Sequence, residues 1–482
     1  MANCDLSGQP FERYRELLDD PERFAAAVRE PLPVTIWANT ERIAADELAG
    51  ILTEEGFSPA PIPWYPGGFR LPASQRLGKH WGFFAGLYQI QEEAAMLPAM
   101  LLDAQPGESV LDLCAAPGGK TTQIALSMRN RGTLIANELN RKRLGALGQT
   151  CDRLGVRNVS IWQRDGVSLP RNAGFFDRIL VDAPCSCEGT SRKNARIKLQ
   201  ADPAYSRKRR GAQLGLLLKA AQLCRVGGRI VYATCTYAPE ENELLVAEVL
   251  EGYGADCLRI LPVRVPGLNT SPGLTEWEDA SLPGDLRNCL RVWPHQNNTG
   301  GFFVAVLEKV SERERKVAVE AGPRDALEAV PGTWKEDVQD RYGLPEDLLE
   351  NLVFTLSGVD HIAAVAADHA PPGVVQREKV GGRFLHRSGA VLRLTHPGAL
   401  LVGGHATRNV IDLGPQQLEA FLARRASPMP THQLKTCDPV GHVVVRYKGK
   451  AVGIGRLLVD DRTGDTVLRS HFPKTWSRYA AS

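Results

Sequence analysis

Short apolar runs alternate with longer amphipathic stretches between Ser109 and Val310, the pattern expected of a parallel β-sheet with crossover helices. The runs are rich in β-branched residues and have the length of buried strands. They predict strands at Val110–Leu113, Thr133–Glu138, Val159–Gln163, Arg178–Asp182, Arg229–Thr234 and Phe302–Leu307, with a further candidate at Cys257–Pro262. Helices are expected to begin near Gly119, Asn140, Pro203 and Pro239. The segment is therefore predicted to be a doubly wound α/β domain.

The chain on either side of this segment has a different pattern. The first hundred residues combine helical stretches at Phe11–Arg29 and Glu41–Glu55 with a Pro/Gly-rich connector, Pro59–Gly68. We therefore expect a separate N-terminal module of the α+β class. Beyond the charged segment Ser311–Asp325, a helical stretch gives way to short strands such as Val443–Lys450. We predict an N-terminal module at 1–100, the α/β domain at 101–310, a linker at 311–325, a small domain at 326–395 and a β-rich domain at 396–482.

Composition narrows the class of protein. The 482 residues are 43% hydrophobic and 23% charged, which is typical of a globular chain of several domains and excludes fibrous or wholly disordered proteins. No long uncharged apolar run occurs, and Met1–Asp20 lacks the pattern of an export signal. Ten cysteines are too few for a disulfide scaffold, and the ten histidines form no HxxxH pair. We expect a cytoplasmic protein without a metal cofactor. The sequence does not decide the oligomeric state, and a monomer is favoured.

The first predicted strand is followed by a loop of small residues that leads into a helix. Small residues allow a ligand to approach the backbone, and a helix start offers free N–H groups to an anion. Neither phosphate motif fits, because the Walker A glycine position before Lys120 is occupied by Cys114 and there is no GxGxxG. A nucleotide-like ligand with a carboxylate, such as S-adenosylmethionine, fits better than a turn that merely packs helix on strand. The candidate ligand loop is Cys114, Ala115, Ala116, Pro117, Gly118, Gly119 and Lys120.

Acidic residues follow the next two strands. Glu138 ends the second strand, where an acidic side chain typically accepts bonds from ribose hydroxyls, and Asp165 follows the third, where it could accept a bond from an adenine amino group. Either acid alone could be a helix cap. Together, after this loop, they favour an adenosyl ligand.

Cysteines follow the fourth and fifth strands, at Cys185 and Cys235. Most free cysteines are small buried hydrophobes. We expect that role for Cys4, Cys151, Cys224, Cys257, Cys289 and Cys437, and we expect Cys114 to pack as well. Beside a methyl donor, however, a thiolate can add to carbon 6 of a pyrimidine and make carbon 5 nucleophilic. Asp182 could hold a proton at ring nitrogen 3 during that addition. These residues do not decide which thiol is the nucleophile, and no residue is indicated as the base that removes the carbon-5 proton.

Four sequence blocks resemble the Sun-type (NSUN) RNA cytosine-5 methyltransferases. They are Asp112–Lys120 (DLCAAPGGK), Asp182–Cys185 (DAPC), Ala233–Tyr237 (ATCTY) and Arg291–His295 with Gly301–Phe303. Further blocks at Pro31–Thr40, Pro61–Gly68 and Tyr88–Pro98 resemble the bacterial branch that acts on small-subunit ribosomal RNA, and Gly441–Gly455 with His471–Lys474 resembles its PUA-like RNA-binding domain.

The resemblance implies a Rossmann-like class I methyltransferase that methylates cytosine carbon 5 in 16S ribosomal RNA. Its methyl donor would be S-adenosyl-L-methionine, with S-adenosyl-L-homocysteine as the product. It implies that Cys235 is the nucleophile and that Cys185 helps to release the methylated product. The Cys114–Lys120 loop, Glu138, Asp165 and Asp182 would bind the donor. Cys187 matches a position with no assigned role.

The net charge of +3 argues at first against a nucleic-acid partner, but the segment 191–211 holds eight basic residues and one acid. Such a segment is often a solvated surface. It directly follows the Cys185 loop, however, so we expect it to meet RNA phosphates through Arg192, Lys193, Arg207, Lys208, Arg209 and Arg210, with Arg196 and Lys198 nearby. Two alternatives stay open: the same chemistry on transfer RNA, and a non-catalytic ribosome-assembly factor that binds RNA.

Overall fold

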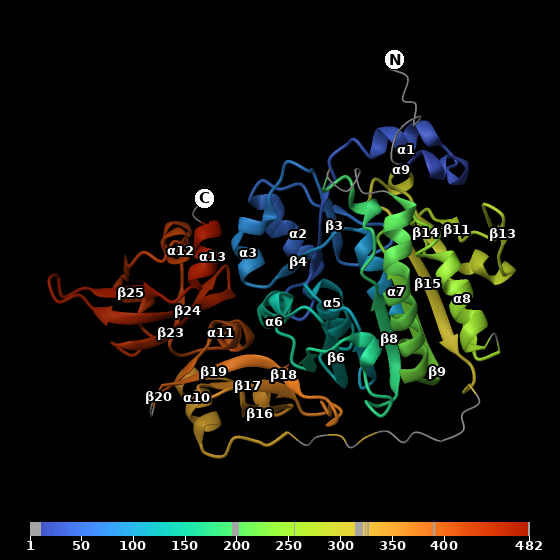
Figure 1. The fold of residues 1–482 in the computed structure, drawn as a ribbon. Helices are drawn as coiled ribbons and strands as arrows, with labels where there is room; N and C mark the ends of the chain where they lie inside the picture. The colour runs from blue at the N-terminus through green and yellow to red at the C-terminus, as the bar shows by residue number, and fades with distance from the viewer. Residues whose placement is uncertain are drawn as a thin grey trace.

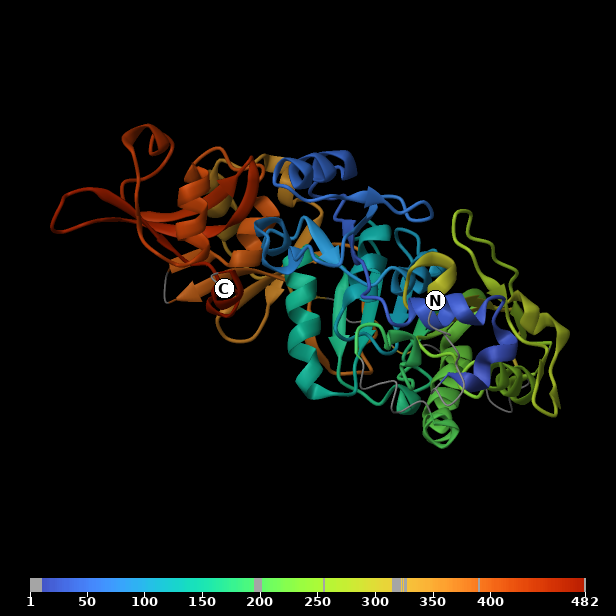
Figure 2. The same cartoon turned by 90° about the horizontal axis from the view of Figure 1, so that it is seen from above.

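The computed structural model describes residues 11–194, 202–254, 256–313, 322, 324, 327–388 and 391–480. A large mixed sheet with helices on both faces forms one side of the molecule, and two smaller sheets from the C-terminal part form the other (Figure 1). The N-terminal module lies between them, as the view from above also shows (Figure 2). Within the described part of the chain, no helix combines the length and apolar character needed to cross a membrane.

The large sheet has ten strands, in the order β11-β14-β15-β9-β8-β5-β6-β7-β18, with β10 paired to β15. Its five inner strands, from β9 to β7, are parallel, whereas β15, β14 and β18 run antiparallel to their neighbours. The strands are β5 (Ser109–Asp112), β6 (Thr133–Asn137), β7 (Val159–Trp162), β8 (Phe176–Asp182), β9 (Cys224–Thr234), β10 (Leu258–Ile260), β11 (Ser271–Pro272), β14 (Leu290–Val292), β15 (Phe302–Lys309) and β18 (Arg377–Val380). All the strands predicted in this region are present, and the doubly wound α/β class is confirmed.

Burial on both faces explains the continuous apolar runs of the inner strands. Every residue of β5, β6 and β7 is buried. Neighbouring residues point to opposite faces, so Val110 packs in one apolar core and Leu111 in another. The helices and short turns of this region are η3 (Ala94–Met96), α4 (Leu97–Leu102), α5 (Gly119–Ser127), α6 (Arg141–Leu154), η4 (Gly166–Ser168), η5 (Glu188–Thr190), α7 (Pro203–Leu223), α8 (Glu243–Tyr253), η7 (Gly284–Asn288) and α9 (Pro294–Asn297).

Three of the four predicted helix starts are confirmed. Helix α5 begins at Gly119, while Asn140 caps α6 and Asp202 caps α7 by accepting backbone N–H bonds. The fourth was wrong, because α8 begins at Glu243 and the chain around Pro239 is a turn. Hydrogen bonds to the preceding strand explain why the helix begins later in the chain than expected. The Asn242 side chain donates to the Thr236 carbonyl and accepts from the Thr234 hydroxyl, which ties the turn to the end of β9.

The N-terminal module combines helices with a four-stranded antiparallel sheet of order β2-β3-β1-β4. The helical stretch expected from Phe11 to Arg29 is divided in two by the residues around Asp20, which caps the second part. The elements are η1 (Glu12–Leu17), α1 (Pro21–Ala27), β1 (Val34–Ala38), α2 (Ala45–Glu54), β2 (Ala60–Pro61), β3 (Gly68–Leu71), η2 (Leu77–Lys79), α3 (Trp81–Phe84) and β4 (Tyr88–Ile90). The expected α+β character is present.

Two sheets make up most of the C-terminal part, in the orders β16-β17-β19-β20 and β21-β23-β24-β25-β22. The elements are α10 (Trp334–Tyr342), η8 (Glu346–Leu349), β16 (Leu352–Leu356), β17 (His361–Ala366), β19 (Gly382–Ser388), β20 (Val391–Leu394), α11 (His396–Val402), β21 (Val410–Asp412), α12 (Pro415–Leu422), β22 (Ser427–Pro428), η9 (Thr431–Gln433), β23 (Gly441–Tyr447), β24 (Lys450–Val459), β25 (Thr466–Ser470) and α13 (Lys474–Ala480). A further two-stranded ribbon, β12 (Glu276–Trp277) with β13 (Ala280–Ser281), lies in the α/β region.

The N-terminal module and the last sheet share one apolar core. Ring centroids lie 5.0 Å apart for Trp81 and Tyr447 and 5.3 Å apart for Phe84 and Phe472. Strand β18 likewise ties the C-terminal part to the α/β region by pairing with β7. The proposed boundaries at 1–100, 101–310, 326–395 and 396–482 stay predictions, and most of the expected linker 311–325 lies outside the described residues.

Candidate active site

The predicted ligand loop lies where the strand order of the sheet changes direction. After β5 the chain passes through Cys114–Gly118 into α5, while β6 lies on one side of β5 and β8 on the other. The loop is closed by bonds from Gly118 N to Ala115 O and from Ala115 N to Asn137 O, both 2.8 Å. Gly118 has φ 105°, a conformation that favours glycine, and it forms the start of α5. This is the position at which open α/β sheets bind ligands.

The three predicted acids stand at the carboxyl ends of three of the parallel strands, β6, β7 and β8. Glu138 is buried, and it accepts a 2.8 Å bond from Asn140 N and pairs with Arg143 at 3.1 Å. Asp165 is exposed and caps η4 through Val167 N at 3.1 Å. Asp182 ends β8 and is partly exposed. All three therefore line one edge of the sheet, although Asp165 also has the capping role that a lone acid often has.

Lys120 joins the ligand loop to the fourth strand. Its Nζ donates to Asp182 Oδ2 at 2.7 Å. Burial lowers the pKa of Lys120, but the charge of Asp182 and the hydrogen bond to it outweigh this effect and raise that pKa. Lys120 is thus an ammonium group paired with the Asp182 carboxylate.

Asp112, at the end of β5, is the strongly perturbed carboxyl of this edge. It is buried, and burial raises its pKa to about 7, although the Thr121 hydroxyl donates to Asp112 Oδ2 at 2.7 Å. The Thr121 bond fixes Asp112 beneath the loop, so this acid supports the loop's conformation.

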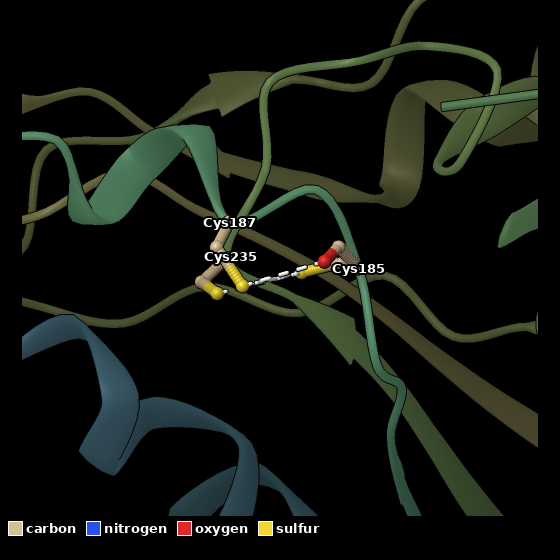
Figure 3. A group of neighbouring side chains, drawn as sticks. All are labelled: Cys185, Cys187 and Cys235. Atoms are coloured by element: carbon tan, nitrogen blue, oxygen red, sulfur yellow. Dashed lines mark hydrogen bonds between the residues drawn. The ribbon is translucent and has the colours of Figure 1, made fainter. Parts of the chain in front are cut away.

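Three thiols meet beside this edge (Figure 3). Cys185 follows β8 and Cys235 follows β9, and these strands are parallel neighbours with Asp182 opposite Ala233. The Sγ atoms of Cys185 and Cys235 are 3.4 Å apart, and the Sγ atom of Cys187 is 3.9 Å from that of Cys185. All three Sγ atoms lie within 4.8 Å of one another. The structure brings the two predicted thiols together, and it adds Cys187, for which no role is predicted from the sequence.

The three thiols perturb one another's protonation. Hydrogen bonds with Cys185 and Cys235 lower the pKa of Cys187, and the charge of Arg209 adds to this effect. The bonds to Cys187 and Cys235, together with burial, raise the pKa of Cys185. For Cys235, the bond with Cys185 lowers the pKa, but the bond with Cys187 and burial outweigh it. Cys235 is therefore a neutral thiol until a neighbouring group takes its proton.

A buried polar network holds the two cysteine loops together. The Glu188 carboxylate accepts bonds from Tyr14 Oη at 2.8 Å, Thr236 Oγ1 at 3.0 Å and Tyr237 N at 3.2 Å. The Thr236 and Ser186 hydroxyls are 2.6 Å apart. Sequence reasoning missed this network, and the adjacency of Ser186, Glu188 and Thr236 to the cysteines was its only signal. The network fixes the spacing between the loops that carry Cys185 and Cys235.

Replacing Thr236 by valine should destabilise the protein. Thr236→Val keeps the shape but leaves Glu188 and Ser186 short of a partner, which costs about 1–3 kcal/mol. Urea denaturation should show a lower free energy of unfolding for Thr236→Val than for Thr236→Ser, which keeps the hydroxyl. Equal stability of the two variants would show that this network does not hold the loops.

The predicted basic residues divide into two groups. Lys193, Arg207 and Lys208 are exposed. The Arg209 guanidinium lies 4.7 Å from the centre of the Tyr205 ring and interacts with the thiols. Lys193, Arg207 and Lys208 are thus accessible to a ligand, whereas Arg209, which also donates to Tyr205 Oη, is the one that lies beside the thiols.

Arg192 and Arg210 have protein partners instead. Arg192 donates to the carbonyls of Glu30, Pro31 and Thr299 and to the Asn298 side chain. Arg210 pairs with Glu248 at 2.5 Å and donates to the Leu244 carbonyl. Because these contacts occupy their guanidinium groups, Arg192 and Arg210 hold the protein together and are not part of the proposed RNA-binding surface. Arg196 and Lys198 lie outside the described residues.

The remaining cysteines mostly pack as expected. Cys151, Cys224, Cys257 and Cys289 are buried, while Cys114 and Cys437 are partly exposed. Cys4 lies outside the described residues.

Two family models match the chain: "16S rRNA methyltransferase RsmB/F" over residues 99–308 and "N-terminal domain of 16S rRNA methyltransferase RsmF" over residues 8–93. The chain is 34% identical over 466 residues to a Vibrio cholerae protein named ribosomal RNA small subunit methyltransferase F, covering 93% of this chain and 94% of that one. It is 37% identical over 302 residues to the tRNA (cytosine(49)-C(5))-methyltransferase of Pyrococcus abyssi, covering 62% of this chain and 94% of that one.

A solved structure is similar as well. A methyltransferase homologue from Pyrococcus horikoshii superposes with a TM-score of 0.54 at 34% identity, covering 62% of this chain and 93% of that one.

Proposed function

Because the chain belongs to the family of 16S rRNA methyltransferases described by the RsmB/F and RsmF models, we propose that it methylates carbon 5 of cytosine through a covalent adduct with Cys235. It is an S-adenosylmethionine-dependent rRNA cytosine-C5 methyltransferase, and its substrate is 16S ribosomal RNA. The observation that carries the covalent mechanism is the 3.4 Å separation of the Cys185 and Cys235 sulfurs beside the Lys120–Asp182 pair.

The residues at the sheet edge suit the methyl donor. S-adenosylmethionine supplies an electrophilic methyl group on a sulfonium sulfur. The Cys114–Lys120 loop presents small residues and the start of α5 to the donor's amino acid part. Glu138 would accept bonds from the ribose hydroxyls, and Asp165 and Asp182 complete the acidic edge. This donor set needs no phosphate-binding motif, which agrees with the absence of one at Lys120.

Cys235 would act on the cytosine. Its thiolate adds to carbon 6, which places electron density on carbon 5 for attack on the methyl group. Lys120 stabilises the developing thiolate. The proton that the Cys235 thiol gives up passes through the Asp182 carboxylate to ring nitrogen 3, where Asp182 holds it during the addition. Loss of the carbon-5 proton then allows the C6–S bond to break and returns the Cys235 thiolate. Cys185, whose sulfur is 3.4 Å from that of Cys235, would assist this release.

Two other functions compete with this one. Transfer RNA is an alternative substrate, since a relative with that substrate named in its description matches the chain. A non-catalytic assembly factor would have no use for two thiols 3.4 Å apart.

Deletion of the gene should remove 5-methylcytosine from 16S rRNA and leave transfer RNA unchanged. Mass-spectrometric mapping of both RNA pools measures this directly, with a strain carrying the restored gene as the control. Loss confined to transfer RNA would overturn the proposed substrate. No loss from either pool would favour the assembly factor.

A row of histidines and arginines crosses both C-terminal sheets, and we propose that it binds RNA. His361, His386 and Arg393 are opposite one another on β17, β19 and β20. Arg393 Nη1 lies 3.3 Å from His471 Nδ1, whose ring centroid is 5.3 Å from that of His442. On the next sheet, His442, Arg456 and Arg469 are opposite one another on β23, β24 and β25. We call these seven residues the histidine-arginine row.

The chemistry of this row suits RNA. Directly opposite residues share one face of a sheet, so the row is continuous within each sheet. Burial and the surrounding positive charges lower the pKa of His442 to about 4, so its ring is neutral at pH 7 and can stack on a base. Arg456 and Arg469 are exposed and available for phosphates. The row supports an RNA-binding, PUA-like role for residues 396–482. The exposed Lys193, Arg207 and Lys208, together with Arg209 beside the thiols, would add further phosphate contacts.

Charge reversal in the row should weaken RNA binding. The double variant Arg456→Glu with Arg469→Glu should raise the Kd for 16S rRNA at least about tenfold and reduce the salt dependence by roughly two phosphate contacts. Filter binding across a salt series measures both. Arg287→Glu, an exposed arginine of the α/β region, is the matched control. Equal weakening by both variants would contradict a specific role for the row.

The expected partner is thus ribosomal RNA or the small ribosomal subunit, and we propose a cytoplasmic location.

A further inference from the structure

Cys187 is a thiol that the methylation mechanism does not use. It lies at φ 62°, a left-handed conformation that favours glycine and is uncommon for other residues. The turn aims its sulfur at the catalytic pair, with the Cys187 Sγ 3.9 Å from the Cys185 Sγ and 3.4 Å from the Cys185 carbonyl. A glycine would fit the backbone better but would bring no third sulfur to this point.

We propose that Cys185, Cys187 and Cys235 form a binding site for a thiophilic d10 metal ion such as Zn²⁺, and that the bound ion reversibly blocks the nucleophile. A tetrahedral zinc ion with Zn–S bonds of about 2.3 Å places its sulfurs roughly 3.8 Å apart. Two of the sulfur separations here are 3.4 and 3.9 Å, and all three sulfurs lie within 4.8 Å. Small side-chain shifts therefore suffice to surround one ion.

The surroundings favour the loaded state. Three thiolates and one Zn²⁺ carry a net charge of −1, which the Arg209 guanidinium offsets, since it interacts with Cys185 and Cys187. Cys187 and Cys235 are partly exposed, so an ion can enter from solvent, while Cys185 is buried behind them. Solvent would fill the fourth position.

Binding has a defined chemical balance. Each thiol that becomes a ligand releases its proton to solvent, up to three per ion, and no oxidant or reductant takes part. The Cys235 lone pair that would attack cytosine carbon 6 is then held by the metal. A chelator that removes the ion returns the free thiol. This regulatory consequence rests on the proposed role of Cys235, whereas the binding itself does not.

Metal binding can be measured without any methylation assay. The full-length protein, stripped by a chelator and reduced with a phosphine, is titrated with Cd²⁺ while thiolate-to-metal charge-transfer absorption is followed, and with Zn²⁺ against a chromophoric chelator. We expect one ion per chain. Cys187→Gly, which suits the left-handed backbone, should bind the metal ion at least about 100-fold more weakly. Removing a group that merely hydrogen-bonds to a metal ligand already lowers metal affinity roughly 10- to 100-fold, and removing a ligand itself should lower it at least as much. Cys437→Ser should bind like the wild type.

Cys187→Ser is a second variant that also removes the sulfur, in case the glycine variant does not fold. Binding of S-adenosyl-L-homocysteine to each variant shows whether the methyltransferase domain is intact. No charge-transfer band in the wild type, or equal affinity in the wild type and both Cys187 variants, would overturn the site. Such a result would leave the methylation function untouched. Inhibition by Zn²⁺ that a chelator reverses in the wild type, and that is lost in Cys187→Gly, would establish the block.

Discussion

Cys235→Ser should lower the rate of cytosine methylation at least about 1,000-fold, because a serine hydroxyl cannot replace a thiolate in the attack on carbon 6. The substitution changes one atom in a pocket that the Glu188–Thr236 network holds in place. Affinity for S-adenosyl-L-homocysteine should stay near that of the wild type, since Cys235 lies outside the ligand loop. Transfer of a radiolabelled methyl group to 16S rRNA measures the rate.

Cys437→Ser is the matched control for this prediction, because Cys437 is a partly exposed thiol in the C-terminal part. It should methylate at the rate of the wild type. Activity of Cys235→Ser close to that of the control would exclude Cys235 as the nucleophile.

Cys185→Ser should trap a covalent complex of protein and RNA. Without the Cys185 thiol, whose sulfur lies 3.4 Å from that of Cys235, release of the methylated base slows while the attack by Cys235 continues. Denaturing gels of the variant with substrate RNA and methyl donor should show a slowly migrating band that nuclease removes.

The double variant Cys185→Ser with Cys235→Ser separates the two thiols. It should form no covalent band, because the attacking group is gone. A band of equal intensity in the double variant would place the bond on another residue, and no band in Cys185→Ser would remove Cys185 from product release.

Local patterns predicted the α/β region well. The inner strands are buried on both faces, so continuous apolar runs such as Leu134–Ala136 identify them without reference to their neighbours. The placement of the Cys114–Lys120 loop and of Cys185 and Cys235 at one edge was likewise predictable, because strand ends in a parallel sheet share one edge. Their roles in catalysis stay predictions.

Features that depend on contacts far apart in the sequence were not predictable. Strand β18 (Arg377–Val380) has no local signal that it pairs with β7. The start of α8 is delayed by the bonds of Asn242 to the end of β9, which compete with the local preference of Pro239 for a first helical turn.

The same limit applies to the site. Cys187 joins the thiols only because of a left-handed turn, and the histidine-arginine row exists only once two sheets are paired and packed. The net charge of the whole chain, +3, does not reveal this row, because a sum over all residues does not show where arginines gather on one face.

The central claim is that Cys235 forms the bond to cytosine. Its most direct test is peptide mapping of the adduct that Cys185→Ser forms in living cells on its natural RNA. The denatured complex is digested with nuclease and protease, and mass spectrometry locates the residue that carries the nucleotide. We predict a methylated cytidine nucleotide on Cys235. A nucleotide on Cys187 or on any residue other than Cys235 would contradict the mechanism.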